Sequence, residues 1–119
     1  MSALNVVNVA TINALSAGLA LTTSAQDLIA AIASSHIALV DSIYASNVDG
    51  TVAETVTVTI VKSGPTSFIL AKTISVPAGA SLVIADKSSE INLQEGDKIT
   101  GLAGSSSKIV LFASWKDLS

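Results

Sequence analysis

The stretch ETVTVTIV, residues 54–61, decides the fold class because its polar and apolar side chains alternate strictly. Val56, Val58 and Ile60 occupy the even positions, and threonines occupy the odd positions 55, 57 and 59. Successive side chains of a β-strand point to opposite faces. The stretch therefore predicts a strand with one face on a core and the other on water or a neighbouring subunit.

Similar short apolar stretches recur along the chain, separated by turn residues at intervals of about ten, the spacing of sandwiches and barrels. Residues 4–15 carry apolar side chains in both parities, as a strand buried on both faces would. This pattern predicts an all-β, antiparallel β-sandwich of jelly-roll or immunoglobulin-like type, with roughly eight to ten strands in one domain over residues 1–119. Further strands are expected at 16–24, 37–46, 67–76, 81–85, 91–93, 98–104 and 108–115.

A helix competes with a strand or loop in one place, near residues 25–33. Ser24 could cap a helix with Asp27 three residues later, and the apolar residues that follow have helical spacing. A strand or loop is the main expectation here, and one short helix is the alternative.

Turn residues separate the expected strands. Asp-Gly between two alternating stretches is a strong hairpin signal, because Asp tolerates and Gly favours the left-handed conformation. Pro fixes its own φ, and Gly is free to adopt a positive φ. The serines at 105–107 leave a link short enough for a hairpin between the last two strands. The expected structural turn positions are Asp49, Gly50, Pro77, Gly79, Gly96 and Asp97.

Asn47, Asp49 and Glu54 place oxygen-bearing side chains around Gly50, which raises the question of a calcium loop. An EF-hand loop has a Glu six residues after its central Gly. Here that position is Val56, and Glu54 comes only four residues after Gly50. We expect a turn without a metal.

The composition argues against several classes of function. The chain is 50% apolar but only 3% aromatic, and it has no Cys, which removes disulfides and thiolate metal sites. There is no Arg, the first Lys is Lys62, and the net charge is −3, so a basic footprint for nucleic acid is missing. The first charged residue is Asp27, unlike the basic start of a secretory signal, and polar residues interrupt every long apolar stretch. Neither a nucleic-acid nor a membrane partner is expected, and no cofactor.

Catalytic candidates are weak. His36 is the only histidine, with Ser34, Ser35 and Asp41 nearby, but no serine has the GxSxG context of a nucleophile. We expect His36 to lie at the polar end of a loop. The acids at 90, 95 and 97 flank a short strand and a turn, where solvated carboxylates are ordinary, and no glycine fingerprint for phosphate occurs. The sequence predicts no enzyme, and a hydrolase would have to depend on His36.

Trp115 near the C-terminus is expected to close the core, with an interface anchor as the alternative because Trp is enriched at interface hot spots. The uncharged N-terminal residues 1–14 are a candidate intersubunit strand or arm. The candidate interface residues are Leu4, Val6, Val7, Val9 and Trp115.

Residues 40–119 carry a recognisable order of motifs: SNVDGT at 46–51, the alternating strand, LAKTISVPAGASLV at 70–83, LQEGD at 93–97 and VLFASWKDLS at 110–119. In this order the chain resembles a family of small β-sandwich virion structural proteins of tailed bacteriophages, met especially in phages of cyanobacteria and marine bacteria. The N-terminal part fits more loosely.

The resemblance implies a non-enzymatic protein located in the virion, which is assembled in the host cytoplasm, and it carries over no catalytic residue. The leading expectation is a capsid decoration or cement protein that stabilises the head as a homo-oligomer, a trimer being favoured, with the major capsid protein as partner. A neck or tail component, an adaptor or a fibre, is the alternative within the particle. A carbohydrate- or receptor-binding β-sandwich module is the alternative from another class.

Overall fold

The structure is a computed structural model that describes residues 10–64, 66–86, 88 and 91–119. These residues form nine strands and no α-helix, and none of them belongs to a helix that could cross a membrane. The strands are β1 (Ile12–Ala20), β2 (Gln26–Ile29), β3 (Ile37–Asn47), β4 (Glu54–Lys62), β5 (Thr66–Val76), β6 (Ser81–Ala85), β7 (Ile91–Leu93), β8 (Lys98–Ala103) and β9 (Ile109–Leu118).

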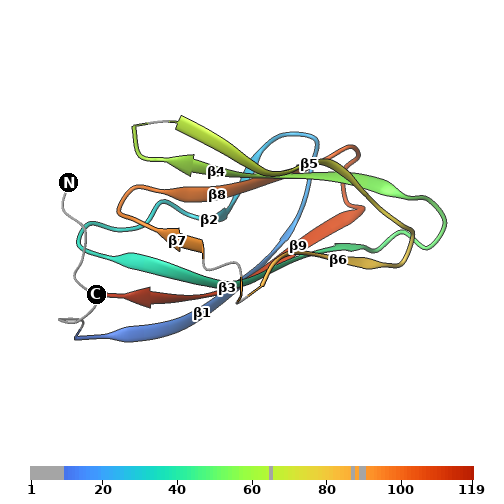
Figure 1. Cartoon of the computed structure of the whole chain (residues 1–119). Coiled ribbons are helices and arrows are strands. Elements are labelled where there is room, and N and C mark those ends of the chain that lie inside the picture. The colour runs from blue at the N-terminus through green and yellow to red at the C-terminus, as the bar shows by residue number, and fades with distance from the viewer. Residues whose placement is uncertain (1–9, 65, 87, 89–90) are drawn as a thin grey trace.

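The strands form two antiparallel sheets that lie as two layers (Figure 1). We call them sheet A, in the order β1-β9-β3-β6, and sheet B, in the order β2-β8-β4-β5. β7 pairs with the start of β3 and β6 with its end, so β6 and β7 share one position beside β3. The nine strands therefore fill the eight positions of a double Greek key, the jelly roll. The predicted β-sandwich is confirmed, and the strand order selects the jelly roll over the immunoglobulin-like alternative.

Most connections cross from one sheet to the other, and this corrects two expected hairpins. β3 lies in sheet A and β4 in sheet B, so Asp49-Gly50 sits in an arch between layers, and Gly50 does not adopt a positive φ. The link 105–107 likewise joins β8 in sheet B to β9 in sheet A. A local turn signal marks where the chain reverses, but it does not say which strands pair. The hairpin predictions at these two places are wrong.

Two other expected turns have the predicted backbone. Gly79 and Gly96 adopt φ values of 69° and 84°, in the left-handed region that favours glycine. The N–H of Ala80 donates to the carbonyl of Pro77 at 3.0 Å and closes the turn between β5 and β6. These turns link the two sheets as well, because β5 belongs to sheet B and β6 to sheet A.

The helix alternative near residues 25–33 is wrong, because residues 26–29 form β2 and pair with β8. A register irregularity between Asp27 and Ile29 lets two consecutive apolar residues, Leu28 and Ile29, be buried together. A β-bulge of this kind breaks period-two alternation. The helix-like spacing thus arises from a bulged strand.

The core fills the space between the sheets with small aliphatic side chains. Val56 and Val58 are fully buried, as predicted from the alternation, while Ile60 is only partly buried near the end of β4. The layers approach closely at Gly101 of β8. A Cβ built there would lie 2.4 Å from Leu111 Cδ1 and 3.2 Å from Leu21 Cδ2. Glycine at 101 is therefore a packing requirement between the sheets.

Candidate functional site

The loop that raised the calcium question is held by protein groups. Asn47 is buried at the end of β3, and its amide nitrogen donates to the carbonyls of Val52 (2.9 Å) and Val76 (3.0 Å). Its amide oxygen accepts the N–H of Asp49 at 2.9 Å. Asn47 thus fastens its own loop to the end of β5, which explains why an amide side chain is needed there.

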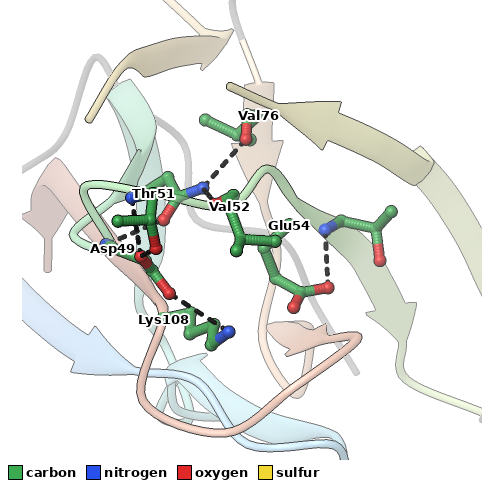
Figure 2. A network of polar contacts seen from close by, with 8 residues as sticks. Asp49, Thr51, Val52, Glu54, Val76 and Lys108 are labelled. Atoms are coloured by element: carbon green, nitrogen blue, oxygen red, sulfur yellow. Dashed lines mark hydrogen bonds and ion pairs between the residues drawn. The ribbon is translucent and has the colours of Figure 1, made fainter. Parts of the chain in front are cut away.

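Figure 2 shows Asp49 between Thr51 and Lys108. One carboxylate oxygen accepts both the N–H and the hydroxyl of Thr51 at 2.8 Å, and the other faces the Lys108 ammonium at 3.1 Å. The backbone bond from Thr51 is the main reason that the pKa of Asp49 lies well below its usual range, with the Thr51 hydroxyl and Lys108 acting in the same direction. The Lys108 ammonium supplies the positive charge beside this carboxylate.

Glu54 completes the same region. Its carboxylate accepts the N–H of Thr55 at 2.9 Å, and this bond, followed by one with the Ser105 side chain, lowers the pKa of Glu54. Gly104 passes so close that an added Cβ would lie 2.4 Å from a Glu54 carboxylate oxygen. Together, the side chains of Asn47, Asp49 and Glu54 hold the loops 47–54, 76–80 and 104–108 in place, so their role is structural.

Replacing Asn47 with Ala is expected to lower the free energy of unfolding by about 2 kcal/mol, because a buried carbonyl of Val76 and partly buried backbone groups of residues 49 and 52 lose their partner. Urea unfolding followed by circular dichroism measures this change. Ser46→Ala is the control, since the Ser46 hydroxyl bonds the exposed Ser81 hydroxyl. Equal losses in both variants would contradict the fastening role of Asn47.

Asp97 was expected to be a solvated turn residue, and this is wrong: only 1% of its surface is exposed. Its carboxylate accepts the N–H groups of Ser63 (2.9 Å) and Gln94 (2.8 Å) and forms an ion pair with Lys62. Burial raises the pKa of Asp97, but the bonds from Lys62, Ser63 and Gln94 outweigh it and lower the pKa below the ordinary value of 3.8. The residue joins the β4–β5 hairpin to the β7–β8 turn.

A carboxylate whose pKa is lower in the folded state stabilises the fold above its ordinary pKa and loses that effect as pH falls. We expect the unfolding free energy to fall between about pH 6 and about pH 3. Asp97→Asn should show a smaller acid-induced decrease, with Asp49 and Glu54 accounting for part of what remains. Urea midpoints at the two pH values measure this. An unchanged acid-induced decrease in Asp97→Asn would contradict the assignment.

The residues of a conceivable catalytic triad do not meet as such. His36 Nδ1 lies 2.7 Å from Asp117 near the end of β9, whereas Asp41 pairs with Lys116 at 2.7 Å. The backbone N–H of Ser35 donates to Glu95 at 3.1 Å. His36 thus ends its loop, as expected, and fastens it to β9. Sequence spacing did not suggest Asp117, because only the pairing of β3 with β9 brings the two segments together.

The candidate interface residues have different outcomes. Leu4, Val6, Val7 and Val9 lie outside the described residues, so their role stays a prediction. Trp115 is partly buried and packs against the core, as the favoured interpretation expected. It pairs with Val40 on β3 and with the exposed Leu15 on β1.

Sheet A presents a row of exposed apolar side chains that sequence spacing did not reveal. The register aligns Gly18, Phe112, Tyr44 and Val83 across four neighbouring strands. Phe112 is 46% and Tyr44 40% exposed, so two of the four aromatic residues stand on this outer face. We call Phe112, Tyr44 and Val83 the aromatic row.

A shallow hollow of about 630 Å³ opens beside Tyr44. Asp41 bulges out of β3 at this point, where the register with β9 shifts between Val40 and Ser42. An aromatic ring next to hydroxyl and carboxylate groups is a surface that polar organic ligands can use. The hollow is lined by Asp41, Ser42, Tyr44, Asp86, Ser88 and Ser114.

The outer edge of sheet B is formed by β5, which pairs only with β4 in the part of the chain that the structure describes. Phe68 and Ile69 are 57% and 54% exposed, and Leu70 and Ile74 are exposed as well. The first half of β5, residues 66–71, contains no charge and no proline. Proteins usually protect such edges with charges, prolines, bulges or short strands. Here two bulges interrupt the pairing with β4, one near Thr73 (φ 50°) and one at Leu70, so residues 66–69 are the part in regular register.

Comparison with known proteins adds evidence on the fold. No protein-family model matches the chain, and no curated protein matches it. A solved structure described as "Bacillus endospore appendages form a novel family of disulfide-linked pili" is similar, with a TM-score of 0.56 and 19% sequence identity. The match covers 92% of this chain and 87% of that chain. At this identity it shows a shared fold.

Proposed function

We propose that this protein is a non-enzymatic structural subunit that assembles into a larger particle through its exposed strand edges and sheet faces. The observation that carries the proposal is the β5 edge, a long strand that among the described residues pairs with β4 alone and exposes Phe68, Ile69 and Leu70. An exposed apolar edge is a template for pairing with another chain. Burying it in an assembly turns a hazard into a specific contact.

The particle we propose is the virion of a tailed bacteriophage, with the chain as a decoration protein on the head and the major capsid protein as its partner. The order of motifs over residues 40–119 supports this choice, and the jelly roll suits a rigid shell component. The aromatic row on sheet A is the face we assign to the shell, because its exposed rings can be buried against a partner without loss of a charge. A neck or tail position in the same virion remains the alternative location.

A second candidate is a filament of copies of this chain, which the fold similarity to a pilus subunit favours. The similar protein belongs to pili described as disulfide-linked, whereas this chain has no Cys. A filament of this protein would therefore be held by non-covalent strand pairing alone.

The carbohydrate-binding alternative is favoured by one observation, the hollow beside Tyr44. Binding on a glycan array that is lost in Tyr44→Ala would support it. Trp115→Ala is the matched comparison, because Trp115 packs against the core and lies outside the hollow. Equal loss in both variants would point to unfolding.

The virion proposal is tested by mixing the purified protein with phage heads that lack it and counting bound copies by quantitative mass spectrometry. Saturation at one copy or trimer per repeating position of the capsid lattice is the expected result. Saturation at the copy number of a single ring would move the protein to the neck or tail. Absence of binding would contradict a place on the head. Where binding occurs, Phe112→Ser is the control that distinguishes specific binding through the aromatic row from non-specific binding.

A further inference from the structure

We propose that the β5 edge is completed by the N-terminal segment of a second copy, residues 3–9, which adds as a fifth strand to sheet B. The inference rests on the proposed self-assembly and names its contact. The receiving edge is residues 66–69, which pair regularly with β4 and carry no charge.

The edge is open on both of its faces. Phe68 pairs with Ile60 on the side of the sheet that faces the core, and Ile69 pairs with Thr59 on the outer side. Both are more than half exposed. Phe68 therefore stands at the margin of the core without a cover, and an added strand with an apolar side chain beside it would extend the core by one position.

The donor segment has a composition that matches this edge. ALNVVNV, residues 3–9, has no charge, and it offers apolar side chains in both parities through Val6 and Val7. A strand that contacts Phe68 on one face and Ile69 on the other needs this arrangement. Charged residues would oppose burial, and none occurs before Asp27.

The geometry of the sandwich favours a second copy as the donor. Ala10 and Thr11 both bond to the Ser119 carbonyl, next to the start of β1. β1 and β5 lie at opposite edges of the sandwich, since β1 contacts β2 and β5 contacts β6. Nine extended residues span about 30 Å, and crossing three strand spacings and one layer uses roughly 17 Å of this. A path around the packed core is longer than this straight line, so the same chain would retain fewer than the four residues needed to pair with 66–69.

The complete absence of Cys makes a clean cross-linking test possible. Three receiver variants, Ser67→Cys, Phe68→Cys and Ile69→Cys, are each mixed with the donor variant Val7→Cys under mild oxidation. Paired strands bring opposite Cα atoms to about 5 Å, within reach of a disulfide. Because every chain carries one Cys, a donor–receiver disulfide can only join two chains. Ala14→Cys on the exposed edge of β1 is the control receiver.

The expected result is a mixed disulfide with at least one of the three receivers, since a one-residue offset changes which face a side chain occupies. The Ala14→Cys control should form at least about tenfold less mixed disulfide. Receiver–receiver disulfides as the main product would show that β5 pairs with β5 and would overturn the proposal. Mixed disulfides mainly with Ala14→Cys would place the arm on β1 and also overturn it. If the Cys-free protein self-associates but no mixed disulfide forms, the arm proposal fails and the proposed self-assembly stands. If the Cys-free protein does not self-associate at all, both fail.

Discussion

Asp97→Ala is expected to lower the free energy of unfolding by about 4 kcal/mol, because it removes a buried carboxylate and each backbone N–H group left without its acceptor costs about 1–3 kcal/mol. The variant leaves the N–H groups of Ser63 and Gln94 without their acceptor. It also leaves the Lys62 ammonium without its carboxylate. Because Asp97 joins the β4–β5 hairpin to the β7–β8 turn, loss of its carboxylate should destabilise the hairpin and the turn together.

The measurement is urea unfolding of Asp97→Ala beside Asp27→Ala. Asp27 also pairs with a lysine in sheet B, Lys98 at 3.2 Å, but both partners are substantially exposed. Exposed ion pairs contribute at most about 1 kcal/mol, so the control should change stability little. Similar losses in the two variants would show that Asp97 acts as one more surface charge.

Gly101→Val is expected to lower the free energy of unfolding by about 3 kcal/mol, because added atoms in a close-packed core force neighbouring side chains and backbone to move. The Cβ of Val would meet Leu111 and Leu21, which are fully buried. Relief would require the two sheets to separate or both leucines to change rotamer.

Gly50→Ala is the matched control for this variant. A Cβ at Gly50 meets no atom within 4 Å, and the backbone there does not require glycine. The change should alter stability by less than about 0.5 kcal/mol. A Gly101→Val protein as stable as Gly50→Ala would contradict the close approach of the sheets at β8 and β9.

The fold class could be predicted from the sequence because period-two alternation is a local property, and Val56 and Val58 are buried as it requires. The partners of each strand could not be predicted the same way. Asp49-Gly50 looks like a hairpin locally, but the chain crosses to the other sheet there. β2 was obscured by its bulge, which buries Leu28 and Ile29 together.

The candidate surfaces were harder to predict, since they depend on register between distant strands. Phe112 and Tyr44 lie 68 positions apart in the sequence and become neighbours only through the pairing of β3 with β9. The burial of Asp97 depends on Lys62 and Ser63 from another turn. Turn residues with polar side chains are usually solvated, and nothing within residues 93–98 indicates otherwise.

Sedimentation velocity over a concentration series tests most directly whether the protein assembles through its β5 edge. The wild type should associate, and Ile69→Lys should weaken the association by about tenfold or more, because a lysine on an edge strand opposes pairing. Thr59→Lys is the control, since it adds the same charge opposite Ile69 on the interior strand β4. A wild-type protein that stays monomeric at every concentration, or one equally impaired by both lysines, would contradict assembly through this edge.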